Sequence, residues 1–205
     1  MNAVCEVVGA YARASRSVKF FTRGRLRSTN EKMKNLEAKF RLANHADAEA
    51  RATALGYTRR AILNQRDTFF RVSNGKLKLR EENGSAALIF YRRDQSGPLM
   101  LSNYEIVPVA EPSRTLRMLA DALGAIAVVE KMRTLMMRDN VRLHLDTVAN
   151  LGEFGEIEAV IAEGDSPEQS RAAVDQILAA LGVARADLID VSYFEMLATT
   201  PERAR

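Results

Sequence analysis

The chain has 205 residues, no tryptophan and one cysteine, with 30 lysine and arginine residues against 26 aspartate and glutamate residues, a formal net charge of +4. Its 47% hydrophobic and 27% charged residues are typical of a soluble globular protein, and eleven glycines and five prolines exclude collagen-like and low-complexity classes. The single cysteine excludes a disulfide framework, and no apolar stretch approaches the roughly 18 residues of a membrane span. An isoelectric point near 9.4 suggests nucleic-acid binding, because clustered basic residues attract phosphate.

The positive charge is concentrated at the N-terminus. Residues 1–33 carry seven basic and two acidic side chains, a charge of +5, which leaves 23 basic and 24 acidic side chains, a charge of −1, in the other 172 residues. A basic, acid-poor segment fits an organelle transit peptide, a disordered basic arm or an upstream extension that is not translated. We therefore leave residues 1–33 out of the fold and expect no nucleic-acid binding by the folded part.

Hydrophobic alternation and turn residues predict about eight strands and three or four helices. Residues 35–42 alternate strictly between polar and apolar, which is typical of a strand with one buried face. Asn-Gly pairs at 74–75 and 83–84 predict antiparallel hairpins, and glycines at the ends of apolar-periodic stretches predict helix termini. The expected strands span residues 35–42, 64–72, 76–81, 87–93, 104–109, 127–135, 141–148 and 156–162, and the expected helices span 47–55, 112–123, 167–181 and about 185–189. This pattern predicts the α+β class with a large antiparallel sheet or barrel.

The polar faces of these strands carry both signs of charge. Acidic and basic side chains two residues apart share one face of a strand, opposite an apolar face. The residues concerned are Glu37 and Lys39, then Lys76, Lys78 and Arg80, then Lys131 and Arg133, then Arg142, His144 and Asp146, and finally Glu156 and Glu158. One interpretation is that these are solvated faces of a half-buried sheet. The other is that the helices cover the apolar faces and the sheet curls closed, so that the charges line a tunnel that fits a metal-bridged polyphosphate.

These motifs resemble those of the CYTH superfamily, the triphosphate tunnel enzymes, and most closely its class IV adenylyl cyclase-like branch. The resemblance covers residues 34–197, and the order and spacing of its pieces carry it. The pieces are Asn35-Leu36-Glu37-Ala38-Lys39, Gln65-Arg66-Asp67-Thr68-Phe69-Phe70, the basic strand 75–80, residues 88–93 ending near Arg92, Lys131-Met132-Arg133, residues 141–146, residues 151–158 and the closing segment 192–197. Asn35 stands where the superfamily motif has its first glutamate, which removes one metal ligand.

The resemblance implies a CYTH fold, an eight-stranded antiparallel closed β-barrel or tunnel with peripheral helices, over residues 34–197, followed by a tail at 198–205. It also implies one or two Mg²⁺ or Mn²⁺ ions as cofactors, with Glu37 and Lys39 as candidate catalytic residues. Lys39 is expected to help activate the nucleophile through a lowered pKa. The implied metal ligands are Glu37, Asp146, Glu156 and Glu158. The implied triphosphate-binding residues are Lys39, Lys78, Arg80, Arg92, Lys131, Arg133 and Arg142.

The function expected from this resemblance is a metal-dependent reaction on a triphosphate, most simply the conversion of ATP to cyclic AMP and pyrophosphate. Hydrolysis of inorganic triphosphate, or of a nucleoside or thiamine triphosphate, uses the same machinery. A non-catalytic polyphosphate-binding module is the alternative of another class. Expected partners are ATP or inorganic triphosphate, without a membrane, in a cytoplasmic monomer or homodimer. His144 is expected to pack behind the site rather than carry a proton.

Overall fold

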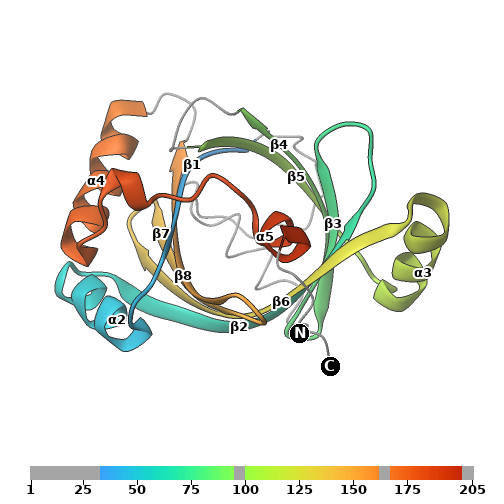
Figure 1. Cartoon of the computed structure of the whole chain (residues 1–205), viewed down its shortest axis with the longest axis horizontal. Helices are drawn as coiled ribbons and strands as arrows, with labels where there is room; N and C mark the ends of the chain where they lie inside the picture. The colour runs from blue at the N-terminus through green and yellow to red at the C-terminus, as the bar shows by residue number, and fades with distance from the viewer. Residues whose placement is uncertain (1–32, 95–99, 162–166, 200–205) are drawn as a thin grey trace, which may run out of the picture.

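The first strand, β1 (Met33–Arg41), pairs with both β5 (Met100–Pro108) and β8 (Gly152–Ile161), and these two pairings close the sheet on itself (Figure 1). The remaining strands are β2 (Thr58–Phe70), β3 (Lys76–Glu82), β4 (Ser85–Asp94), β6 (Ala125–Arg138) and β7 (Val141–Val148). All neighbours are antiparallel, in the order β1-β5-β4-β3-β2-β6-β7-β8. The expected eight-stranded antiparallel barrel is thereby confirmed.

This computed structural model describes residues 33–94, 100–161 and 167–199. Of the segment 1–33, residues 1–32 lie outside the described residues, whereas Met33 begins β1 and so belongs to the fold. Of the expected tail 198–205, residues 198 and 199 belong to a helix and 200–205 lie outside the described residues, as does the side chain of Asn35. No helix in the described part of the chain is both long and apolar enough to cross a membrane.

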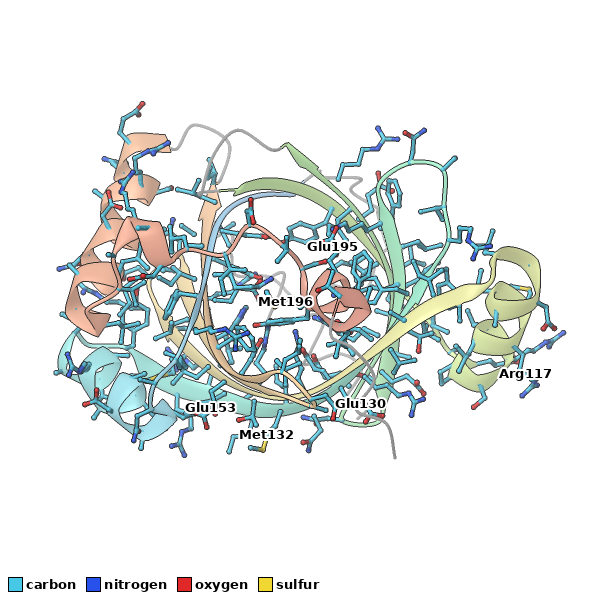
Figure 2. All side chains as sticks on the ribbon, viewed as in Figure 1. Arg117, Glu130, Met132, Glu153, Glu195 and Met196 are labelled. Atoms are coloured by element: carbon cyan, nitrogen blue, oxygen red, sulfur yellow. The ribbon has the colours of Figure 1, made fainter. Side chains whose placement is uncertain are left out.

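Helices lie on opposite sides of the barrel. The helices α2 (His45–Ala54) and α4 (Pro167–Leu181) lie together against the outer face of β1, β7 and β8 (Figure 1). On the other side, α3 (Pro112–Leu123) has no buried side chain, and Figure 2 shows Arg117 directed away from the barrel. A short 3₁₀ turn, η1 (Arg185–Asp187), precedes the last helix, α5 (Tyr193–Thr199).

The main hydrophobic core lies outside the barrel, between the sheet and the α2–α4 pair. It contains the apolar faces of β1, β7 and β8, including Phe40, Leu143 and Ile157, each 0% exposed, together with Val174 and Ile177 of α4. Because successive side chains of a strand point to opposite faces, burying these apolar residues beneath the helices turns the charged residues of the same strands into the barrel. The helices therefore set which face of the sheet becomes the interior.

Two differences from the expected elements have physical causes. Strand β2 begins at Thr58, six residues earlier than expected, because a register shift between Arg59 and Ala61 interrupts the alternation that marks a strand. Helix α5 was not expected at all. Its start carries a recognisable signal, since the backbone N–H of Ser192 donates to Glu195 Oε2 at 2.7 Å in the spacing of a capping box.

Gly155 fits beneath an aromatic ring of the core. It lies opposite Phe40 in the β1–β8 register, and a Cβ atom at position 155 would overlap the Phe40 ring. Phe40 is itself fully buried, so the ring has no free space into which it can move. A residue other than glycine at this position would push β8 away from β1.

We expect Gly155→Ala to lower the free energy of unfolding by about 1–3 kcal/mol, because it overpacks the core. Urea denaturation of the purified chain measures this change. The same substitution in a Phe40→Leu background is the control, since the shorter side chain leaves room for the added methyl group. An equal loss in both backgrounds would contradict the proposed clash.

Candidate active site in the barrel interior

Charged side chains of both signs surround a cavity of about 110 Å³ inside the barrel. The cavity is lined by the basic residues Lys39, Lys78, Arg80, Lys131 and Arg133 and by the acidic residues Glu37, Asp67, Glu156 and Glu158. These residues come from strands β1, β2, β3, β6 and β8, and strand alternation brings them to one face. The tunnel interpretation of the charged strand faces is therefore the one that the structure supports.

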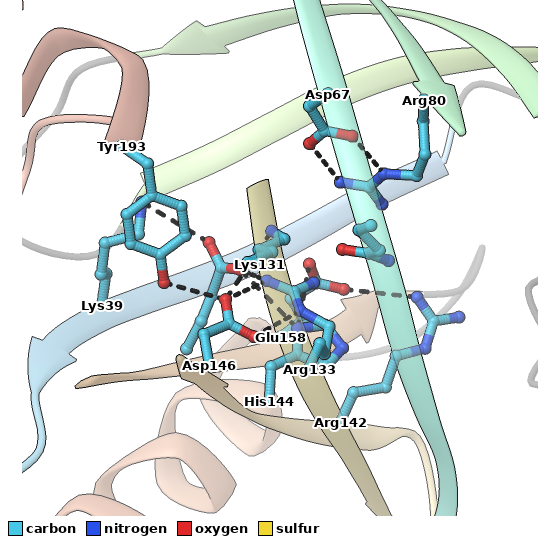
Figure 3. A network of polar contacts seen from close by, with 12 residues as sticks. Lys39, Asp67, Arg80, Lys131, Arg133, Arg142, His144, Asp146, Glu158 and Tyr193 are labelled. Carbon is cyan, nitrogen blue, oxygen red and sulfur yellow. Dashed lines mark hydrogen bonds and ion pairs between the residues drawn. The ribbon is translucent and has the colours of Figure 1, made fainter. Parts of the chain in front are cut away.

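The centre of the site is a buried network around Arg133 (Figure 3). Its guanidinium donates from Nε to Asp146 Oδ1 at 2.7 Å and from Nη2 to both Asp146 Oδ2 and Glu156 Oε2 at 2.6 Å. The Tyr193 hydroxyl donates to Asp146 Oδ2 at 2.9 Å. Burial alone would raise the pKa of Asp146, but Arg133 and then Lys131 bring it down to about 2. Asp146 therefore stays ionised and holds the guanidinium in place.

A second cluster joins β2 to β3. Asp67 accepts from Lys78 Nζ at 2.8 Å and from Arg80 Nε and Nη2 at 2.7 Å each. Burial and then repulsion from Arg80 lower the pKa of Lys78 to about 7. Burial and then repulsion from Arg133 lower the pKa of Lys131 to about 8. Both lysines are thus close to losing their charge at neutral pH, and a bound anion would restore it.

Glutamates on β8 lie between charged partners on both neighbouring strands. Glu156 is opposite Lys39 on β1 and His144 on β7, and the Lys39 Nζ atom is 3.7 Å from Glu156 Oε1. Glu158 is opposite Glu37 on β1 and Arg142 on β7, whose Nη1 donates to Glu158 Oε2 at 3.4 Å.

Burial would raise the pKa values of both β8 glutamates. Lys39 and Arg133 hold the pKa of Glu156 well below its usual value. His144 and Arg142 lower the pKa of Glu158. Both carboxylates are therefore ionised at neutral pH.

Helix α5 supplies part of the cavity wall. Ser192 and Tyr193 line the cavity, and Figure 1 shows α5 drawn over the barrel interior. The Tyr193 ring lies 4.3 Å from the Lys39 Nζ atom and 5.1 Å from the Lys131 Nζ atom, measured to the ring centroid. These cation–π contacts hold both ammonium groups beside the acidic network.

The remaining wall is apolar and aromatic. It consists of Phe69, Ile89, Tyr91, Tyr104, Ile106 and Val129 on strands β2, β4, β5 and β6. A ligand in this cavity therefore meets both charged groups and aromatic or aliphatic groups. Such a lining suits a polyanion that carries an organic group.

The structure brings most of the expected site residues together. Those that line the cavity are Glu37, Lys39, Lys78, Arg80, Lys131, Arg133, Glu156 and Glu158. Arg142 and Asp146 are 3% and 0% exposed and contact this set through Glu158 and Arg133.

Arg92 is the exception and requires a correction. It is exposed, and its guanidinium carbon lies 5.5 Å from the Phe90 ring centroid. Ile89 and Tyr91 line the cavity, so alternation along β4 places residue 92 on the outer face. Arg92 therefore does not belong to the interior phosphate-binding set.

The acidic residues are also arranged differently from the expected metal-ligand set. Among the described residues, one group of three ligand-type side chains has atoms within 4.8 Å of one another, and it consists of His144, Glu156 and Glu158. Asp146 is instead engaged by Arg133, Lys131 and Tyr193. Burial and then Arg133 lower the pKa of His144, so the ring is neutral at pH 7.

The sequence analysis assigned no binding, catalytic or metal-ligand role to three contributors to this site: Asp67, His144 and Tyr193. The alternation of Gln65, Asp67 and Phe69 already placed Asp67 on an inner face, and His144 shares a face with Arg142 and Asp146. Tyr193 had no such signal, because it reaches Asp146 across a sequence separation of 47 residues.

Comparison with known proteins identifies the family. A family model described as CYTH domain matches residues 33–193. A Methanocaldococcus jannaschii protein named "Putative adenylate cyclase" is 24% identical over 132 residues, which cover 63% of this chain and 75% of that protein.

Solved structures share the fold. A Pyrococcus horikoshii protein superposes with a TM-score of 0.71 at 22% identity, covering 78% of this chain and 98% of its own. A Hippeastrum protein, described as a "Putative adenylyl cyclase" with a dominant triphosphatase activity, superposes with a TM-score of 0.57 at 17% identity, covering 80% and 95%. The family match spans most of the chain, and the barrel with its charged interior agrees with it, so this chain belongs to the CYTH domain family.

Proposed function

We propose that this chain is a metal-dependent enzyme that acts on a triphosphate inside its barrel, converting ATP to cyclic AMP and pyrophosphate. One observation carries the proposal: lysines, arginines and glutamates, all buried or half-buried, line a single cavity. A polyphosphate chain matches the basic residues, and a divalent cation bound to that chain matches the glutamates. Few other ligands match both kinds of residue at once.

The basic residues bind and orient the phosphates. Arg80 and Arg133 present planar guanidinium groups that match phosphate oxygens in a bidentate way, whereas Lys78 and Lys131 act as point charges. As the 3′-oxygen of ribose bonds to the α-phosphorus, the bond to the β-phosphate oxygen breaks and the 3′-hydroxyl proton leaves. In this proposal the Glu37 carboxylate, or Lys39 once its amine is neutral, receives this proton, and the basic residues stabilise the negative charge of the leaving pyrophosphate.

The acidic residues fit a divalent cation by their own chemistry. Glu37 lies directly opposite Glu158 in the β1–β8 register, and like charges in such a pair repel unless a cation lies between them. The His144 Nδ1 atom, 3.7 Å from Glu158 Oε1, is buried without a hydrogen-bond partner. Glu37, Glu156 and Glu158 would hold the cation, and Asp146 would act by positioning Arg133. When bound, Mg²⁺ or Mn²⁺ supplies charge neutralisation and orientation of the phosphates.

The aromatic and aliphatic wall supports an organic triphosphate as substrate. Phe69, Tyr91 and Tyr104 offer ring faces on which a nucleobase can stack, whereas inorganic triphosphate has no group to place there. Hydrolysis of a triphosphate is the second candidate reaction, favoured by the triphosphatase activity described for the Hippeastrum neighbour. A binding module without turnover remains the alternative of another class.

Incubation of the whole chain with ATP or tripolyphosphate and Mg²⁺ or Mn²⁺ should yield cyclic AMP and pyrophosphate from ATP, identified by chromatography. Glu156→Gln and Glu158→Gln should each lower turnover by at least about 100-fold, because they remove ligand charge from the metal site. Glu153→Gln, on the outer face of the same strand, is the matched control. Orthophosphate as the product would indicate a hydrolase, and binding without turnover would indicate a polyphosphate-binding module. Activity that persists in both Glu156→Gln and Glu158→Gln would contradict the assignment of these residues as metal ligands.

Tripolyphosphate affinity should fall as the pH rises above about 7, by at most about tenfold per pH unit for one lysine. The pKa of Lys78 is lowered to about 7 in the free protein, so its charge is lost above that pH, while bound phosphate favours the protonated form. Isothermal titration calorimetry between pH 6 and 9 measures this slope. In Lys78→Arg the guanidinium stays charged, and the slope should be shallower, whereas an equal slope in both proteins would rule out Lys78 as its source.

Lys39→Ala should lower kcat by about 100-fold or more, in the range of other general acid–base groups. Lys39 is 2% exposed, and its amine lies 3.7 Å from Glu156 Oε1 and 4.3 Å from the Tyr193 ring centroid, so these two residues restrict its position in the cavity. Steady-state kinetics with a thermal-melting control measure the effect. A normal kcat in the folded variant would remove Lys39 from the catalytic set.

A further inference from the structure

His144 directs an unpartnered nitrogen at the two glutamates of β8. The side chain is 2% exposed, and its Nδ1 atom is buried without a hydrogen-bond partner. That atom lies 3.7 Å from Glu156 Oε2 and 3.7 Å from Glu158 Oε1. A buried polar atom without a partner is costly, and carboxylate oxygens beyond hydrogen-bond distance do not compensate for it.

The spacing of these three atoms suits metal coordination. In an octahedral site with bonds of about 2.1 Å, neighbouring ligand atoms are about 3.0 Å apart and opposite ones about 4.2 Å apart. The two separations of 3.7 Å from Nδ1 lie between these limits, and ligand atoms of the three residues all lie within 4.8 Å of one another, so a movement of the side chains can bring all three onto one cation.

Basic neighbours already fix the carboxylates in this orientation. Arg142 donates to Glu158 Oε2, which leaves Oε1 facing His144. Lys39 lies beside Glu156 Oε1, and Arg133 uses one lone pair of Oε2, the oxygen that faces the imidazole. Each glutamate thus has one oxygen 3.7 Å from Nδ1.

We propose that His144 is a nitrogen ligand of the metal in this tunnel, and that it makes the site prefer a transition-metal dication such as Mn²⁺ over Mg²⁺. Mg²⁺ binds oxygen ligands and gives up water reluctantly. Imidazole suits transition metals, whereas carboxylate oxygens alone suit Mg²⁺ and Mn²⁺ alike. The inference rests on the proposed function only in taking the β8 glutamates as the metal site.

Pulsed electron paramagnetic resonance of Mn²⁺ bound to the whole chain, without substrate, tests the proposal directly. A directly bound imidazole produces a ¹⁴N coupling in the electron spin echo. The chain has two histidines, and the other, His45, lies at the start of α2, outside the barrel. We expect the coupling in the wild type and in His45→Gln, and its loss in His144→Gln.

Affinity gives a second measurement. Titration with Mn²⁺ alone should show at least about a tenfold weaker affinity in His144→Gln, since changes even outside the ligand shell cost 10–100-fold in other sites. Mg²⁺ affinity should change little, because an amide oxygen replaces the nitrogen. Equal losses for both metals would show a structural role for His144 and overturn the proposed preference.

The wild-type spectrum decides the proposal even where the variant does not fold. Mn²⁺ bound without ¹⁴N coupling, or no Mn²⁺ binding at all, overturns it. Turnover of ATP or tripolyphosphate with Mg²⁺ is measured separately. Turnover without the ¹⁴N coupling would contradict only the histidine ligand. The ¹⁴N coupling without any turnover would support the histidine ligand and contradict the proposed enzymatic function.

Discussion

The ion pair between Arg133 and Asp146 is the interaction on which the interior depends. Both side chains are nearly inaccessible to water, at 2% and 0%, and an unpaired charge there would cost several kcal/mol. Arg133 Nη2, which donates to Asp146 Oδ2, also donates to Glu156, and the same Asp146 oxygen accepts from the Tyr193 hydroxyl. One pair thereby links strands β6, β7 and β8 to helix α5. The barrel can hold these charged side chains in its interior because each of them is paired with a group of opposite charge or with a hydrogen-bond donor.

The same pairing makes the interior ready for an anion. Arg80 and Lys78 converge on Asp67, so a carboxylate occupies the position at which two basic groups point. A phosphate group that enters must compete with this carboxylate but needs no rearrangement of the backbone, since the bases already face the cavity. Preorganised charge of this kind has a larger electrostatic effect than mobile surface charge, because water does not reorient around it.

Much of the fold could be predicted from local patterns. The helices 112–123 and 167–181 and the strand 141–148 have the predicted bounds, because proline or a hairpin turn begins each and glycine or a second turn ends it. The start of β2 could not be predicted, since its bulge disturbs the alternation. For Arg92, a resemblance between motifs did not fix the register, and a shift of one residue moves a side chain from the inside of a barrel to the outside.

The sequence by itself determined the strand alternation, the acidic and basic residue types, and the family. These depend on neighbours within a few positions, and a period of two is visible without a structure. Only the tertiary structure decided that the charged faces point inward, because this depends on where α2 and α4 pack and on the pairing of β1 with β8. Only the tertiary structure brings the Tyr193 hydroxyl to Asp146 and groups the His144 side chain with Glu156 and Glu158. Contacts between segments that are distant in the sequence form only when the barrel closes.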